Sequence, residues 1–416
     1  MLLAGLLAGP LAAPAHAAKP DQLKPNRYEV GAVPALGGDT DVGFGFGAVL
    51  SLARFQAGYY PFRWRLELQG YLTVKERPEG GVEWPFHDHY LKLDLPGLLS
   101  PRLRWTLRVG FSRFVTAGYY GLGNAAPAVS RADAFDPTLQ PREYNEALRY
   151  HQFDRVFPRA LANVRVTLRK ELQLFFAGTA AFNDLRLYPG SKLAEDVASG
   201  PPAVRGMLFG ASRHLTLQGD AGVLWDSRDH DMVPRSGVLH EASLRAGTFE
   251  EGRVYGGFNV TLRFFHAFFR DYLTLAARAV FDLLFGQVPV YELARYGGLF
   301  PDYGPGGSTS VRGVPGQRYH GKLKLVGNLE LRSKWLPFTV LKQRFNVGTV
   351  VFADAGRVWA DYTERPELDG KGLGLKVGAG GGVRLQWGEA FMIRTDVAWS
   401  PDASPIGFYV DIFHIF

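Results

Sequence analysis

Hydrophobic and polar residues alternate along most of this chain with a period of two. In the stretch 373–387, Leu375 and Leu385 fall on one face, whereas Lys376 and Arg384 fall on the other. A period of two is the side-chain repeat of a β-strand, so the pattern predicts strands with one apolar and one polar face. The same alternation recurs in three further stretches, at 64–74, 103–112 and 323–332.

Sixteen such strands can be counted back from the C-terminus. The long connections 117–148, 187–213 and 287–320 all follow odd-numbered strands, whereas the connections after even-numbered strands are short. Short turns at one end and long loops at the other are typical of antiparallel bacterial barrels. The predicted strands are 27–34, 42–54, 63–75, 84–98, 103–116, 157–169, 171–186, 214–228, 237–250, 253–269, 271–286, 321–335, 344–359, 372–387, 390–400 and 407–416.

Two architectures are compatible with many amphipathic strands. A soluble β-sandwich turns its apolar faces inward and seldom carries so many Lys, Arg, Glu and Gln residues opposite them. A transmembrane barrel turns the apolar face to lipid and the polar face to its lumen, and closure pairs every backbone group. We therefore predict an all-β fold, a 16-stranded antiparallel transmembrane β-barrel, with a soluble β-protein as the alternative.

Composition narrows the function classes. The 416 residues include 50 glycines and 13% aromatics, and beyond the N-terminus no apolar run of about 18 residues occurs, which excludes a helical membrane protein. The absence of cysteine excludes disulfide scaffolds, thiol catalysis and Cys-ligated metals. A net charge of +7 is mild for this length, and we expect no nucleic-acid partner.

The N-terminal residues form a short apolar run that ends in Ala15-His16-Ala17, an Ala-x-Ala cleavage pattern. This pattern predicts a signal peptide over residues 1–17 and a barrel domain over residues 18–416. A buried N-terminal helix is the alternative, but Pro10 and Pro14 would interrupt it.

Three short motifs lie between the eleventh and thirteenth strands. The first is Val311-Arg312-Gly313 in the longest loop, the second contains Glu330, and the third is Phe352-Ala353-Asp354-Ala355-Gly356. In this order the motifs resemble those of the BamA/TamA outer-membrane superfamily, also called bacterial surface antigens, which includes two-partner secretion transporters.

The resemblance implies that the long sixth extracellular loop folds into the lumen, where Arg312 meets Asp354 with Glu330 nearby. Val314 stands where the family has an aromatic residue. Strand alternation independently places Asp354 and Glu330 on lumen faces, where a guanidinium can bind a carboxylate in a fork. An exposed pair contributes about 0–1 kcal/mol, so only a buried pair could hold so long a loop. A Gly-rich surface turn is the alternative for the loop motif.

Two further segments resemble family elements. Tyr119-Tyr120-Gly121-Leu122-Gly123-Asn124 is similar to the F-Y-G-x-G-N sequence of the short, barrel-only branch. A second segment is similar to the D-x-R-D…P-x-x-G element of a periplasmic turn; a calcium loop at 229–231 is its alternative, although the Gly and terminal Glu of such a loop are absent. The residues that carry this turn are Asp226, Arg228, Asp229, Pro234 and Gly237.

The last ten residues run from Gly407 through Phe408 to a terminal Phe416, with apolar residues at alternating positions. This segment resembles the C-terminal insertion signal of outer-membrane barrels, with His414 where an apolar residue is usual. Few residues precede the first strand, so we expect the barrel-only branch without POTRA domains.

The sequence contains no nucleophile elbow and no zinc-binding H-E-x-x-H motif. We therefore expect neither an enzyme nor a bound metal or cofactor; His87 and His89 are interpreted as part of a polar strand. A membrane phospholipase or protease is the weakest of the functions considered.

The leading hypothesis is a barrel in the outer membrane of a Gram-negative bacterium that inserts, assembles or translocates proteins or lipids. Its expected partners are outer-membrane lipid and lipopolysaccharide, with periplasmic chaperones, client proteins or a second copy as further candidates. The rival hypothesis is a passive, partly plugged channel that favours anions because of its basic lumen residues. These residues are Lys322, Lys324, Arg332, Lys376 and Arg384.

Overall fold

The structure is a computed structural model, and it describes most of the chain. The signal peptide expected over residues 1–17 lies outside the described residues. The described residues are 26–416 apart from 60, 78–79, 127–133, 137–138, 232, 270–271, 335, 341–342, 388–390, 404–405 and 413.

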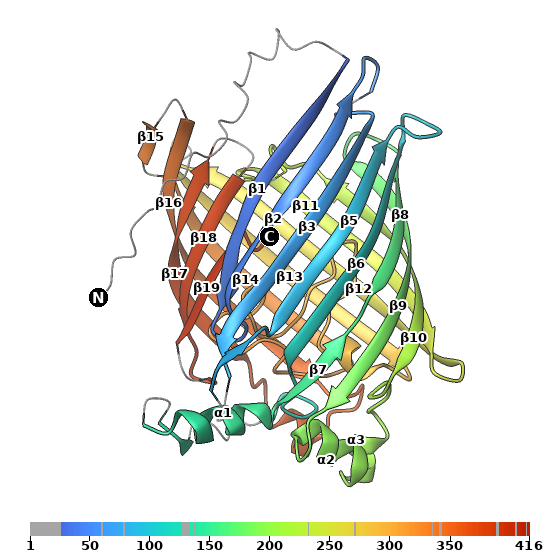
Figure 1. Cartoon of the computed structure of the whole chain (residues 1–416), viewed down its shortest axis with the longest axis vertical. Helices are drawn as coiled ribbons and strands as arrows, with labels where there is room; N and C mark the ends of the chain where they lie inside the picture. Colours follow the sequence, from blue (N-terminus) through green and yellow to red (C-terminus); the bar gives the residue numbers. More distant parts are fainter. Residues whose placement is uncertain are drawn as a thin grey trace.

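The chain forms a closed antiparallel β-barrel with sixteen strands in its wall (Figure 1). Nineteen strand segments make up the wall, because β4 and β5, β7 and β8, and β14 and β15 each follow one another along a single wall position. The segments are β1 (Arg27–Asp39), β2 (Gly43–Phe55), β3 (Trp64–Glu76), β4 (Val82–Glu83), β5 (Phe86–Pro96), β6 (Leu103–Gly118), β7 (Gln152–Val156), β8 (Arg159–Thr167), β9 (Leu172–Leu187), β10 (His214–Asp226), β11 (Gly237–Phe249), β12 (Arg253–Phe268), β13 (Leu273–Gly286), β14 (Leu323–Ser333), β15 (Leu336–Val340), β16 (Gln343–Trp359), β17 (Lys376–Trp387), β18 (Phe391–Trp399) and β19 (Gly407–Ile412).

Several strand boundaries differ from those expected. The first strand, expected over 27–34, extends to Asp39 because its whole length pairs with β2. The strand expected over 157–169 starts earlier, at Gln152, and is interrupted at Pro158, which has no N–H to donate to the ladder. The strand expected over 372–387 begins only at Lys376.

The two faces of the wall differ in polarity as a transmembrane barrel requires. The side chains of Leu244 and Val351 are 60% and 58% exposed on the outer face. On the inner face, Arg245 binds Asp282 through two hydrogen bonds of 3.0 Å, and both residues are buried. The apolar positions of the sequence thus face outward, and many of the polar positions meet inside.

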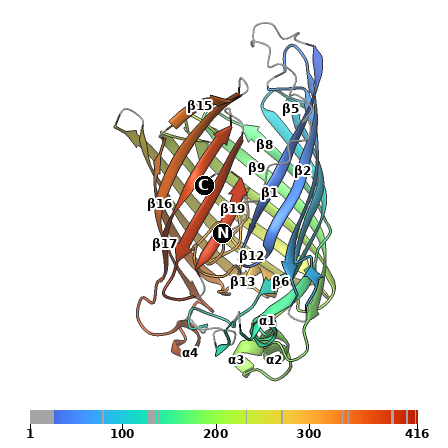
Figure 2. The ribbon, with the colours of Figure 1, turned by 60° about the vertical axis from the view of Figure 1, so that its left-hand side comes forward.

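The four α-helices of the described part of the chain lie at the end of the barrel that carries the long loops, here called the loop end (Figure 2). Ser191 caps α2, accepting a hydrogen bond from the N–H of Ala194 at 3.4 Å. Within the described part of the chain, no helix is both long and apolar enough to cross a membrane. The helices are α1 (Pro141–Arg149), α2 (Lys192–Ala198), α3 (Pro202–Arg205) and α4 (Pro366–Asp369).

The barrel closes where β1 meets β19, here called the seam (Figure 2). Only two residue pairs join these strands in the described part of the chain, Gly38 with Val410 and Asp39 with Tyr409. By contrast, β1 pairs with β2 along all thirteen of its residues. The seam is therefore the shortest ladder in the wall between consecutive wall strands.

The outward direction of the apolar face can be tested by placing a lysine on it. We expect Leu244→Lys to lower the free energy of unfolding by about 2–4 kcal/mol, because Leu244 lies near the middle of β11 on the outer face. Thr179→Lys is the matched control, since Thr179 lines a cavity in the lumen. Urea unfolding in lipid vesicles measures both variants, and equal effects would contradict the assignment of the faces.

Candidate functional site

The longest loop, residues 287–322 between β13 and β14, folds into the barrel; we call it loop 6. Val311 and Val314 at its tip are fully buried. They pack in a cluster with residues from the wall strands, including Val280 on β13 and Val326 on β14. Val314, which stands where the sequence motif has an aromatic residue, is smaller but still lies inside this apolar cluster.

The guanidinium of Arg312 binds Asp354 on β16 in a two-pronged arrangement. Its Nε donates to Oδ2 at 2.8 Å and its Nη2 donates to Oδ1 at 3.0 Å, while the backbone N–H of Arg312 also donates to Oδ2 at 3.1 Å. The guanidinium carbon lies 3.3 Å from the centroid of the Phe352 ring. Three donors and an aromatic face fix both the position and the plane of this side chain.

Two further carboxylates reach the same guanidinium. The Nη1 of Arg312 donates to Glu330 on β14 at 2.7 Å and to Asp396 on β18 at 3.2 Å. All three side chains have no exposed surface. The structure thus brings together the Arg312, Asp354 and Glu330 that sequence motifs single out, and it adds Asp396, which no motif marks.

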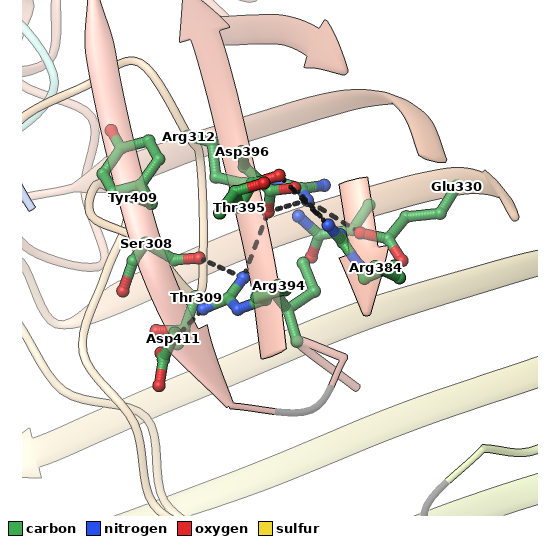
Figure 3. Close-up of polar contacts among 12 residues, drawn as sticks. Ser308, Thr309, Arg312, Glu330, Arg384, Arg394, Thr395, Asp396, Tyr409 and Asp411 are labelled. Carbon is green, nitrogen blue, oxygen red and sulfur yellow. Dashed lines mark hydrogen bonds and ion pairs between the residues drawn. The ribbon is translucent and has the colours of Figure 1, made fainter. Parts of the chain in front are cut away.

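Arg332, Arg384 and Arg394 complete a buried network around Asp396 and Glu330, and Figure 3 shows Arg384 and Arg394 within it. Arg332 donates to Glu330 at 2.8 Å, and Arg384 donates to Asp396 at 2.6 Å. Arg394 donates to Asp411 at 2.8 Å and to the carbonyl oxygen of Ser308 in loop 6 at 3.0 Å. With Arg312 and Asp354, the network brings together four guanidinium groups and four carboxylates, and of these eight groups Asp411 is the exposed one, at 41%.

Glycines let the loop backbone approach the wall closely. Gly313 has a φ of +91°, which favours glycine, and a Cβ there would lie 2.9 Å from the carbonyl carbon of Trp399. On β17, a Cβ at Gly378 would overlap the carbonyl oxygen of Arg312. Gly356, the last residue of the β16 motif, leaves room for Val311, whose Cγ2 would be 3.0 Å from a Cβ.

Loop 6 also contacts both strands that form the seam. The N–H of Gly313 donates to the hydroxyl of Tyr409 on β19 at 2.8 Å. The N–H of Gly316 donates to Asp41, in the turn between β1 and β2, at 2.6 Å. The loop tip therefore bridges the two edges of the wall where they close.

The segment Tyr119–Asn124 forms part of a cap at the loop end. The hydroxyl of Tyr119 donates to Asp196 on α2 at 2.9 Å, and the N–H of Gly123 donates to the carbonyl of His320 at 2.8 Å. Asn124 donates to the carbonyl of Gly374 at 2.6 Å. This segment therefore joins loop 6 to the loops that follow β9 and β16.

The turn between β10 and β11 is held by its own acidic residues. Arg228 donates to both oxygens of Asp226 at 2.8 Å, and Asp229 accepts from the N–H groups of Arg235 and Ser236 at 2.9 and 3.2 Å. Although burial opposes it, these N–H donors hold the pKa of Asp229 below its ordinary value. Pro234 is buried, and Gly237 has a φ of +96°.

The C-terminal segment departs from the expected strand 407–416. The strand β19 contains Gly407 and Phe408, which is 49% exposed on the outer face, but it ends at Ile412. Phe416 instead lies in the lumen, where its ring centroid is 6.2 Å from that of Phe265 and its main-chain oxygen accepts from Arg332 at 3.0 Å. The last residues therefore leave the wall and meet this luminal arginine.

The five basic residues on which the anion-channel hypothesis rests all have carboxylate partners. Three pairs lie apart from the buried network: Lys322 with Asp361 at 3.0 Å, Lys324 with Asp282 at 3.2 Å, and Lys376 with Asp402 at 3.1 Å. Arg332 and Arg384 belong to the network itself. Local carboxylates therefore neutralise these cations, which weakens the electrostatic argument for the channel.

No group of three or more His, Asp or Glu side chains in the described part of the chain is arranged to hold a metal ion. The rings of His87 and His89 are 5.8 Å apart on β5. Asp229 has its oxygen occupied by backbone donors of its own turn.

The sequence and the fold of this barrel are both similar to those of known proteins. Residues 159–412, more than half of the chain, match the Omp85 superfamily domain. The structure of BamA from Haemophilus ducreyi lacking POTRA domains 1–3 is similar, with a TM-score of 0.57 and 14% identity over 93% of this chain and 70% of that chain. CdiB from Escherichia coli has a TM-score of 0.54 and 11% identity over 94% of this chain and 68% of that chain. No curated protein matches this sequence.

The anchor can be tested by removing its cation. We expect Arg312→Ala to lower the free energy of unfolding by about 3–5 kcal/mol, because it leaves the buried carboxylate of Asp354 without a cation. Arg365→Ala is the control, since its pair with Asp361 at 3.4 Å is partly exposed and contributes about 0–1 kcal/mol. Urea unfolding measures stability, and limited proteolysis reports release of loop 6. An Arg312→Ala variant as stable and as protease-resistant as the control would refute the anchor.

Proposed function

This chain belongs to the Omp85 superfamily, and from that premise we propose that it acts in the insertion, assembly or translocation of proteins or lipids at the outer membrane. Its barrel is related in fold to those of BamA and CdiB. We infer the role in insertion or translocation from the seam and from the loop that contacts both of its sides.

The observation that carries this proposal is the short seam. Beyond the two residue pairs at the loop end, the described residues of β1 from Arg27 to Gly37 have no partner on β19. Tyr28 and Val30 on this segment are 62% and 82% exposed. An unpaired strand edge is a template for adding another strand, so a client strand could pair with β1 in the membrane.

The location and partners follow from the same proposal. A signal peptide over residues 1–17 would export the chain, and residues 18–416 would form the barrel in the outer membrane of a Gram-negative bacterium. Its outer face would contact lipid and lipopolysaccharide. Client proteins, delivered by periplasmic chaperones, would meet the seam, where a second copy could also pair. The proposed activity is mechanical and needs no catalytic residue or cofactor.

A disulfide across the seam tests whether its opening matters. In the register of the seam, Leu36 would lie opposite Ile412, and the chain has no native cysteine. We expect vesicles containing the oxidised Leu36→Cys/Ile412→Cys protein to lose their acceleration of the folding of an added, urea-unfolded barrel, and reduction to restore it. Folding is followed by gel mobility.

The control pair, Val223→Cys/Ala242→Cys, joins β10 and β11, which already pair from Thr216 to Asp226. We expect its oxidation to leave the acceleration unchanged. If the oxidised seam variant accelerates folding as well as the unmodified protein, or if the unmodified protein gives no acceleration, the proposed insertion activity is wrong.

A passive channel remains the second candidate because the lumen is not completely filled. A cavity of about 600 Å³ lies beside loop 6. We expect the native barrel to give small, fluctuating currents in planar bilayers, and Arg312→Ala to give larger ones, because release of loop 6 widens the lumen. Large and steady conductance of the native protein would instead favour the channel.

A further inference from the structure

The cavity beside loop 6 lies on the opposite side of the lumen from the Arg312 network. Its wall is formed by β5, β6, β7, β8 and β9, together with parts of β3, β10, β11 and β12. Residues 291–303 of loop 6 cover it on the inner side. A volume of about 600 Å³ lies within the range of small-ligand sites in proteins.

Cations predominate in the lining of this cavity. Nine basic side chains line it, against four carboxylates, Asp88, Asp94, Asp220 and Glu292. An excess of one sign in a partly enclosed space attracts ligands of the other sign. The basic residues are Arg65, Lys92, Arg104, Arg108, Arg155, Arg159, Arg165, Arg245 and Arg295.

Most of these cations are satisfied within the barrel. Arg104 donates to Asp94 through two hydrogen bonds, the longer of them 2.9 Å, and Arg108 donates to Asp88 at 3.2 Å. On loop 6, Arg295 binds Glu292 at 2.8 Å. Lys92 and Arg65 share Glu67 at 2.8 and 2.9 Å, and Arg245 binds Asp282.

Two arginines on β8 differ from the rest. Arg159 and Arg165 form no ion pair and no side-chain hydrogen bond with any residue that the structure describes. The guanidinium of Arg159 lies 5.4 Å from the ring of Phe157, and Arg165 stands directly opposite Arg104 in the ladder between β6 and β8. Like charges directly opposite each other destabilise a sheet. Asp94 already binds Arg104, so Arg165 is the member of this pair that lacks a counter-ion, and a negative ligand beside it would supply one.

The geometry points to a phosphate-binding cavity: we propose that it takes a linear anion with several phosphate groups, held by Arg159 and Arg165. A planar guanidinium matches phosphate oxygens in a two-pronged contact. Arg165 lies six positions after Arg159 on the same strand, which corresponds to about 20 Å, so one ligand must be elongated to reach both. Asn163 and Thr106, which pair across the ladder between them, offer polar side chains along the path.

The proposal can be tested with inorganic polyphosphate and the full chain in detergent. We expect saturable binding in calorimetry, tighter for a long polyphosphate chain than for tripolyphosphate, because only the long chain reaches both arginines. Arg159→Gln and Arg165→Gln should each weaken binding of the long chain about tenfold. Arg142→Gln removes the same charge from an exposed position on α1 and should leave the affinity unchanged.

A second measurement uses only the native protein. Ligand that binds the folded state raises the thermal midpoint, so polyphosphate should raise it beyond the effect of sodium chloride at equal ionic strength. Displacement of the probe by micelles of a phosphorylated glycolipid would assign the phosphates to a lipid headgroup, and failure to displace it would assign them to a soluble anion. Equal affinity in both β8 variants and the native protein, or a midpoint that follows ionic strength alone, would overturn the proposal.

Discussion

The arrangement inside this barrel depends on the buried guanidinium of Arg312. A charged group with no exposed surface is tolerated only when its hydrogen bonds are satisfied, and here Asp354, Glu330 and Asp396 supply acceptors from three different strands. Because loop 6 brings the cation and β16 brings Asp354, that carboxylate has its ion pair only when the loop is docked. The position of loop 6 and the register of β14, β16 and β18 are thus fixed by the same contacts.

Much of the fold was predictable because the membrane imposes a simple pattern. Every wall strand must present apolar residues outward at alternate positions, so the strands could be counted from sequence, and the long loops could be assigned to one end. The boundaries that differ reflect contacts the pattern does not contain. The interruption at Pro158 follows from a missing N–H, and the early end of β19 follows from the contact of Phe416 with Arg332.

The anchor was predictable only in part for a similar reason. Short motifs single out Arg312, Glu330 and Asp354, but Asp396 belongs to no motif and joins them through a side-chain hydrogen bond from Arg312, which lies 84 residues earlier in the chain. The one indication in the sequence was that Asp396 lies two residues after Arg394, on the polar face of β18 that the alternation directs into the lumen. The ion-pair partners of the luminal cations could not be predicted either, because the charge of a residue on a strand does not show which neighbour binds it. Arg384 is held by Asp396 on the adjacent strand, whereas Arg165 faces Arg104.

Loop 6 contacts both Tyr409 and Asp41, so it connects the two sides of the seam. These contacts couple two equilibria, the docking of loop 6 in the lumen and the pairing of β1 with β19. Thermodynamic reciprocity then requires each to strengthen the other by the same free energy. A molecule that displaces loop 6 from the lumen would weaken the pairing at the seam. In turn, a strand that separates β1 from β19 in the bilayer would favour release of loop 6.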